Sequence, residues 1–238
     1  MPLHFRALSV IVVHCSPDTS HLPMISLIHP SRGRPEKSVR NVIDWHTRAG
    51  AEIEIIVSID SSDKSDYQYS YNQLVRTVTK STLIVNDNTS VVEATNVAAK
   101  QSKGDILVYL SDDFTCFPLW GRKLEEEFAK YSGPTLIKVD DCLQKFNVPV
   151  LTIPIMNREL YNKLGYFFHP DFKSMFCDEH LYWKTMQLGA LKFAPHLKFE
   201  HCHVSVGKAP DDETYRRSAA NWEQGKAMFA KHKRAGFP

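Results

Sequence analysis

Two adjacent carboxylates, Asp112 and Asp113, directly follow the apolar run Ile106 to Leu110. Such a run is typical of a buried central strand. Neighbouring carboxylates repel one another, and a divalent cation relieves that repulsion. Mg²⁺ and Mn²⁺ favour one or two carboxylates together with phosphate oxygens. The pair therefore indicates metal-assisted chemistry on a phosphorylated ligand, and the alternative is a turn or cap that opens the next helix.

Short apolar runs alternate with helical patterns through the first 140 residues. The predicted strands are 24–28, 53–59, 82–85 and 106–110, and the predicted helices are 36–49, 71–78, one that Ser90 caps, and 119–131. This alternation predicts an α/β fold, with a mainly parallel sheet covered by helices on both faces. Ligands of such sheets bind beyond the carboxyl ends of the strands. Asp60 and the loop Pro30-Ser31-Arg32 should therefore open on the same edge as Asp112 and Asp113.

The later sequence is less regular and carries no linker. It predicts strands at 135–139, 148–153 and 191–199, and helices at 158–164, 178–188 and 211–233. We expect one domain in four parts: 1–23 as an N-terminal extension or extra strand, 24–140, a smaller region 141–210, and 211–238 as a C-terminal helix.

The bulk composition excludes several classes of protein. A formal net charge of +2 is too small to indicate nucleic-acid binding by itself. The five cysteines are scattered without a CxxC pair, which favours reduced thiols in the cytoplasm. The apolar run Ala7 to Val13 is far too short to span a membrane.

Four stretches together resemble the family 2-like glycosyltransferases of the GT-A fold. They read ISLIHPSRGRP (25–35), EIIVSID (54–60), NVAA (96–99) and GDILVYLSDD (104–113). The resemblance implies a Rossmann-like sheet that binds a nucleotide-sugar donor, of the UDP type, in residues 24–140, and an acceptor in 141–210. The donor-binding residues that it implies are Pro30, Ser31, Arg32, Arg34, Asp60, Asn96, Ser111 and Asp112.

The segment Ser111-Asp112-Asp113 stands where the family has its DxD motif, and Ser111 departs from that pattern. Asp113 then becomes the expected ligand of Mn²⁺ or Mg²⁺, whereas Asp112 would face the ribose or the sugar. Asp60 would meet the base.

A second acidic pair, Asp178 and Glu179, precedes a predicted helix that ends near Gly189. In the resembled family, a carboxylate at this place takes the proton from the acceptor hydroxyl. The spacing to Gly189 assigns that role to Asp178, with Glu179 as the substitute. The alternative is that both acids simply stabilise a helix N-terminus.

His201 and His203 flank Cys202 after a predicted strand, so alternation directs both imidazoles to one face. Members of the resembled fold often add a histidine from this region to the metal. His203 or His201 would serve, and the alternative is a pair of surface histidines.

The sequence thus predicts a metal-dependent, inverting glycosyltransferase in the cytoplasm, or in the host cytoplasm for a viral protein. Its acceptor would be a polysaccharide, a small molecule or a modified DNA base of the phage type. One alternative is a nucleotidyltransferase acting on a sugar phosphate, but this sequence lacks the glycine-rich loop with lysine that such an enzyme needs. The other alternative is an inactive nucleotide- or carbohydrate-binding module.

Overall fold

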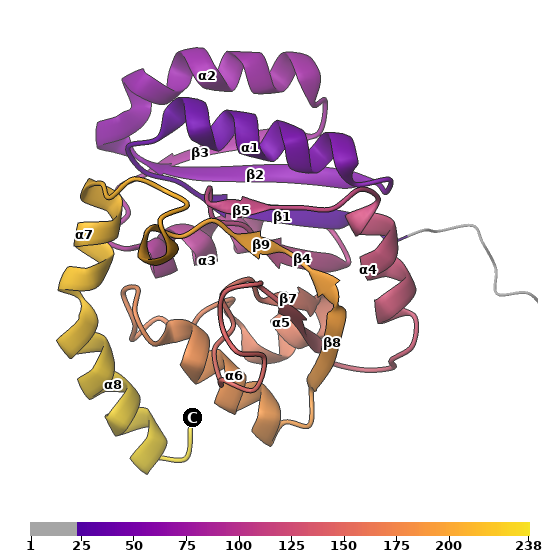
Figure 1. Ribbon diagram of the computed structural model, residues 1–238, viewed down its shortest axis with the longest axis vertical. Coiled ribbons are helices and arrows are strands. Elements are labelled where there is room, and N and C mark those ends of the chain that lie inside the picture. Colours follow the sequence, from indigo (N-terminus) through magenta and orange to yellow (C-terminus); the bar gives the residue numbers. More distant parts are fainter. Residues whose placement is uncertain (1–22) are drawn as a thin grey trace, which may run out of the picture.

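The computed structural model describes residues 23–238, which form one seven-stranded sheet with helices on both faces (Figure 1). The strand order is β3-β2-β1-β4-β7-β6-β8. The strands are β1 (Ile25–Pro30), β2 (Ile53–Asp60), β3 (Ser81–Asn86), β4 (Ile106–Tyr109), β6 (Leu136–Asp140), β7 (Ile155–Asn157) and β8 (Leu191–Lys198). Only β7 runs against its neighbours in this sheet. The predicted α/β architecture is therefore confirmed.

One face of the sheet is covered by α1 (Pro35–Arg48), α2 (Lys64–Thr77) and α4 (Trp120–Phe128). Alternate residues of β1 and β2, such as Ile25 and Ile55, point into this layer and are fully buried. Trp45 of α1 anchors the layer, because its ring stacks on Phe199 at 5.3 Å and its carbonyl accepts a 2.8 Å hydrogen bond from Trp120.

The opposite face packs against α3 (Val91–Gln101), α5 (Arg158–Leu164) and α6 (Cys177–Gln187). Ser90 caps α3 as predicted, since its hydroxyl accepts from the backbone N–H of Glu93. Small residues of α3, Ala98 and Ala99, are buried in this layer.

A short two-stranded ribbon lies over the carboxyl end of β4. It pairs β5 (Phe114–Thr115) with β9 (Glu200–His201) in antiparallel register, with Phe114 opposite His201. The ribbon brings the end of β8 back to the acidic pair that follows β4. A 3₁₀ turn, Val204–Val206, comes next.

The strand predicted at 148–153 is wrong. These residues are irregular, and the strand that enters the sheet is β7, further along the chain. Pro149 and Pro154 each lack a backbone N–H, which disfavours a central strand between them. The ammonium group of Lys138 instead binds the carbonyls of Val148 and Val150.

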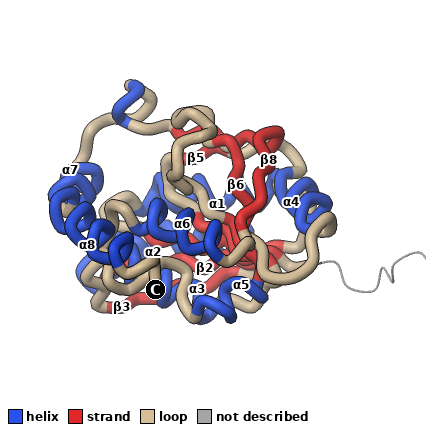
Figure 2. The backbone as a smooth tube through the Cα atoms, turned by 90° about the horizontal axis from the view of Figure 1, so that it is seen from below, coloured by secondary structure: helices blue, strands red, loops and turns tan. Residues whose placement is uncertain are grey.

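The single C-terminal helix predicted over 211–233 is also wrong. The structure has α7 (Glu213–Ala220) and α8 (Trp222–Arg234), which meet at Asn221. The side-chain amide of Asn221 donates to the carbonyl of Arg217, so a polar group caps the end of α7. After the break, α8 lies beside α6 (Figure 2). Gly225 permits the approach, because a Cβ there would lie 2.5 Å from the carbonyl oxygen of Met175.

Other elements match their predicted ranges closely, except that α2 begins seven residues before the expected 71. An η1 turn (Ser61–Asp63) links β2 to it. The expected extension 1–23 lies, apart from its last residue, outside the described residues. Among residues 23–238, no helix is both long enough and apolar enough to cross a membrane.

Replacing Trp45 with alanine should lower the free energy of unfolding by about 3–5 kcal/mol, because a fully buried indole leaves a cavity. Urea unfolding measures the change. Tyr69→Ala is the control, since this ring is 72% exposed and should cost at most about 0.5 kcal/mol. A loss below about 1 kcal/mol for Trp45→Ala would contradict the packing of this layer.

Candidate active site

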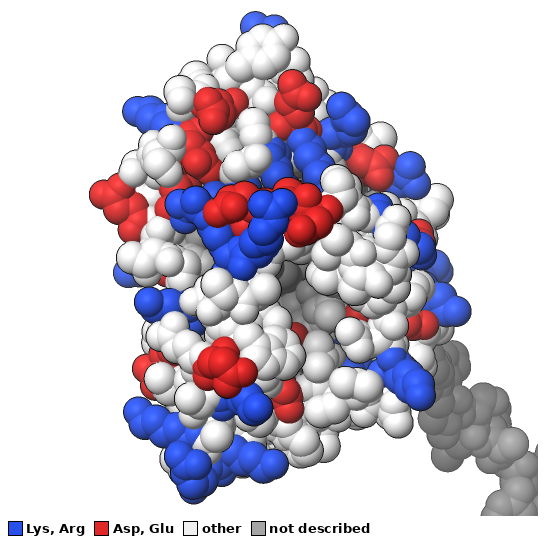
Figure 3. All heavy atoms as spheres, turned by 60° about the vertical axis from the view of Figure 1, so that its left-hand side comes forward, with Lys and Arg blue, Asp and Glu red and all other residues white. Residues whose placement is uncertain are grey.

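A cleft of about 560 Å³ lies at the carboxyl ends of β1, β2 and β4. Residues from the start of α6 and from α7 complete its walls. On the face that carries α7 and α8, acidic and basic side chains lie side by side next to a hollow in the surface (Figure 3). The predicted residues that line the cleft are Pro30, Ser31, Arg32, Arg34, Asp60, Ser111, Asp112, Asp113, Asp178, His201 and His203.

Arg34 holds Asp112 against α7. Its guanidinium donates to Asp112 at 2.6 Å and binds both oxygens of Asp212 at 2.6 and 2.7 Å. It also lies over the ring of Tyr215, 4.6 Å from the centroid. Burial alone lowers the pKa of Arg34, but the bonds to Asp212 and Asp112 outweigh it and raise the pKa above its usual value. Asp112 is thus compensated by a cation within the protein.

Asp113 is compensated only in part. Its Oδ2 accepts a 2.9 Å hydrogen bond from the hydroxyl of Tyr215 and lies 3.2 Å from Nε2 of His201. Its Oδ1 is buried and has no hydrogen-bond partner among residues 23–238. Burial alone raises the pKa of Asp113. The interactions with His201, Ser111 and Tyr215 lower the pKa by more than burial raises it, so the carboxylate stays charged.

A buried anion with one unpartnered oxygen fits a metal ligand. His201 is the second candidate ligand, because its Nε2 lies 3.2 Å from Oδ2 of Asp113 and its ring is held by stacking on Phe114 at 4.2 Å. His203 lies 5.0 Å from His201, ring to ring, but its Nδ1 already contacts Ser205. Both imidazoles line the same cleft, as the alternation of the sequence predicts, and His201 is the one that contacts Asp113.

The far end of the cleft holds the residues expected to meet the nucleotide. Arg32 and Asp60 form an ion pair at 2.9 Å. Burial raises the pKa of Asp60, and the charge of Arg32 opposes that rise. Ser31 hydrogen-bonds to the hydroxyl of Tyr67 at 2.7 Å, which fixes the loop between β1 and α1.

Asn96 has a different place from the one implied by the resemblance. Its amide group donates to the carbonyl of Phe168 and accepts from the N–H groups of Phe167 and Phe168, at 2.7–3.0 Å. Asn96 does not line the cleft. Its side chain therefore orders the loop before α6 and has little capacity left for a donor.

Asp178 stands between two cavities. It lines the cleft and also a second hollow of about 320 Å³, in which Glu179 lies. It is the second residue of α6, so backbone N–H groups of the first turn favour its charged form. Burial is the larger effect and raises the pKa of Asp178 to about 6. A carboxyl group with this pKa can accept a proton near neutral pH.

The sequence did not reveal several residues of the cleft. Tyr215 and Arg217 line it from α7, which the sequence presents as a polar, solvated helix face, and Asp212 precedes this helix. Asp212 carries one readable signal, since it caps α7 through the N–H groups of Thr214 and Tyr215. Its partnership with Arg34, 178 positions away, has no sequence signal.

The overall structure is similar to those of solved glycosyltransferases. A mannosyltransferase from Pyrobaculum calidifontis, PcManGT, solved with GDP-Man and Mn²⁺, matches over 80% of this chain with a TM-score of 0.64 and 16% identity. Residues 1–349 of S. aureus TarS match over 74% with a TM-score of 0.59 and 14% identity, and a complex of TarS with UDP gives 0.57 and 15%. The chain therefore shares the GT-A fold of these structures.

The aligned part spans 60% of the mannosyltransferase chain and 59% of each of these TarS chains. Neither a family model nor a curated protein matches the sequence.

The raised pKa of Asp178 predicts a pH-dependent stability difference. Its pKa is about 6 in the folded protein and about 3.9 when unfolded, so folding favours the protonated form. The stability that Asp178 contributes is fully present below about pH 4 and is lost as the pH rises through 6. Relative to wild type, Asp178→Asn should therefore gain up to about 3 kcal/mol between pH 4 and pH 8.

Urea unfolding of both proteins at several pH values measures this gain. Glu126→Gln, a change at an exposed carboxylate on α4, is the control. A difference between Asp178→Asn and wild type that stays constant from pH 4 to pH 8 would contradict the burial of this carboxyl group.

Proposed function

We propose that the protein is a metal-dependent glycosyltransferase that moves a sugar from a UDP-sugar to an acceptor hydroxyl, with GDP-sugars as the alternative donors. One observation carries the proposal: Asp178, with its raised pKa, lies between two cavities. The larger one contains Asp113, whose buried oxygen is free for a cation. Glycosyl transfer requires one cavity for the donor and its metal, a second cavity for the acceptor, and a general base between the two.

The donor would occupy the larger cleft. A volume of about 560 Å³ falls within the usual range of small-molecule and cofactor sites. At the end of β2, the carboxylate of Asp60 could accept from a base N–H, and both uracil and guanine offer one. Besides Arg34, which is bound to Asp112 and Asp212, three basic residues line the cleft and could face the diphosphate: Arg32, Lys173 and Arg217.

Asp113 and His201 would hold Mn²⁺ or Mg²⁺, with His203 as the further candidate. The bound cation would neutralise the charge that builds up on the departing diphosphate. The hydroxyl of Tyr215 donates a hydrogen bond to Asp113 and so orients the carboxylate toward this task. Arg34 keeps Asp112 in a compensated pair, so Asp112 is the poorer ligand.

Asp178 would act as the general base. From the wall shared by the two cavities it would take the proton of the acceptor hydroxyl as that oxygen attacks the sugar. Attack from the acceptor side, opposite the departing diphosphate, inverts the anomeric centre. Glu179 lies in the smaller cavity and is also raised in pKa by burial, so it would contact the acceptor.

The smaller cavity favours an uncharged acceptor. Phe176 and Trp222 line it together with the carboxylates of Asp178 and Glu179. Of the described residues around it, none is lysine or arginine. Aromatic rings and carboxylates suit the apolar face and hydroxyl groups of a sugar, whereas a nucleic acid needs cations for its phosphates. A carbohydrate or small polyol therefore fits better than a DNA base.

Donor binding can be tested without knowledge of the acceptor. Titrations of UDP, GDP, UDP-glucose and GDP-mannose by calorimetry, with and without Mn²⁺, should show one nucleotide that binds at least tenfold more tightly with the metal. ATP is the control nucleotide and should bind weakly. If none of the four binds in either condition, the proposed function is wrong.

The base can be tested by the slow transfer of the donor sugar to water. Asp178→Asn should lower the release of free sugar by about 10²- to 10⁴-fold while leaving the Kd of the nucleotide unchanged, because only proton removal is lost. Glu179→Gln is the matched control and should change the rate by less than about tenfold. Full activity of Asp178→Asn would remove Asp178 from the mechanism, and a loss confined to Glu179→Gln would move the role to that residue.

A further inference from the structure

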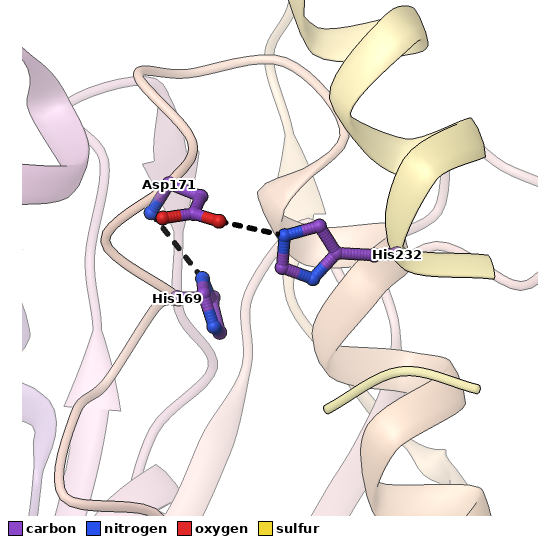
Figure 4. Close-up of side chains that lie close together, drawn as sticks. All are labelled: His169, Asp171 and His232. Carbon is purple, nitrogen blue, oxygen red and sulfur yellow. Dashed lines mark hydrogen bonds and ion pairs between the residues drawn. The ribbon is translucent and has the colours of Figure 1, made fainter. Parts of the chain in front are cut away.

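A second group of metal-binding side chains lies outside both cavities. His169 and Asp171 belong to the loop between α5 and α6, and His232 lies in the last turn of α8. One ligand atom from each of the three lies within 4.8 Å of the others. Figure 4 shows the three side chains converging from the loop and the helix. Sequence spacing gave no sign of this group, because 61 positions separate Asp171 from His232.

The contacts within the group show how it is held. Asp171 Oδ2 lies 2.9 Å from Nε2 of His232, and the backbone N–H of Asp171 donates to Nδ1 of His169 at 3.2 Å. The rings of His169 and His232 are 4.5 Å apart. His232 is buried, whereas the side chain of Asp171 is 43% exposed, so the group has one side open to solvent.

A fourth histidine supports His232 from behind. Nε2 of His180 lies 3.1 Å from Nδ1 of His232, and His180 is fully buried. Without a metal, Nε2 of His232 carries the proton that it donates to Asp171. A metal bound at Nε2 would move that proton to Nδ1, which would then donate to His180. Metal-binding histidines commonly have such a partner on the other ring nitrogen. Nδ1 of His180 is buried without a hydrogen-bond partner in the described chain, so this histidine has no evident role except toward His232.

We propose that His169, Asp171 and His232 bind a Zn²⁺ ion, with a water molecule as the fourth ligand on the open side. Two imidazoles and one carboxylate suit zinc, whereas Mg²⁺ prefers oxygen ligands alone. Ligands about 2.0–2.2 Å from a tetrahedral zinc lie about 3.4 Å from one another. The ligand atoms here lie within 4.8 Å of one another, so small side-chain movements would bring them to that distance.

The ion would fasten α8 to the loop that leads into α6. Asp178 is in the first turn of α6, and α8 begins with Trp222, which packs on Phe176 at 4.9 Å. The carbonyl of Phe237, beyond α8, accepts from Lys184 of α6 at 3.0 Å, so the chain end is already docked there. Zinc at this place stabilises the wall of the smaller cavity and takes no part in sugar transfer. This role does not depend on the proposed function.

Zinc affinity tests the site directly. Metal-free protein competes with a chromophoric chelator for Zn²⁺, and thermal unfolding is followed with and without zinc. Wild type should bind one zinc ion at this site and gain thermal stability from it. His169→Gln and His232→Gln should each lose at least tenfold in affinity, and His180→Gln should lose about 10- to 100-fold.

Two controls separate this site from other histidines and from the donor site. His46→Gln on α1 and Asp113→Asn should keep the affinity and the thermal shift of wild type. Circular dichroism without zinc shows whether each variant is folded. Unchanged affinity in folded His169→Gln and His232→Gln would overturn the proposal. It would also fall if zinc failed to stabilise wild type, or if Asp113→Asn abolished binding.

Discussion

The burial of two adjacent negative charges, Asp112 and Asp113, is the constraint on which this site depends. Both carboxylates are less than 9% exposed at the end of β4, so their charges need partners within the protein. The protein resolves the two charges differently. Asp112 receives the guanidinium of Arg34, whereas Asp113 receives a phenol and an imidazole and keeps one oxygen unpartnered among the described residues.

This asymmetry also explains the position of the C-terminal region. Arg34 has donors left over after binding Asp112, and Asp212 at the start of α7 accepts them in a bidentate pair. Tyr215, one turn further, then reaches Asp113. The break at Asn221 allows α7 to line the cleft while α8 lies on α6. One arginine therefore connects the loop after β1, the acidic pair and the C-terminal region into a single wall.

Local sequence patterns predicted the elements that depend on local chemistry. The β-branched run of β2, the Ser90 cap and the whole of α5 needed no tertiary information. The segment 148–153 was misread because its apolar residues resemble a strand, although two prolines remove the N–H groups that a strand needs. The order of the sheet around β7 could not be read from the sequence, because it depends on pairing between distant segments.

The lining of the cleft was predictable at the carboxyl ends of strands, where Asp60 ends β2 and Asp113 comes shortly after β4. It was not predictable where a partner comes from a remote helix. Tyr215 lies in a helix with a polar pattern, and only the fold shows that its hydroxyl points to Asp113. Asn96 lies in a stretch that resembles the family and was expected to bind the donor. Its side chain instead accepts hydrogen bonds from the backbone N–H groups of Phe167 and Phe168.

The most direct measurement is the binding of Mn²⁺, followed by electron paramagnetic resonance of the free ion in the presence of UDP, for Asp113→Asn and Asp112→Asn. The two substitutions remove the same charge from neighbouring positions. If the free oxygen of Asp113 is the metal ligand, Asp113→Asn loses more than tenfold in Mn²⁺ affinity and Asp112→Asn loses much less. Equal losses in the two variants, or wild-type affinity in Asp113→Asn, would contradict this account.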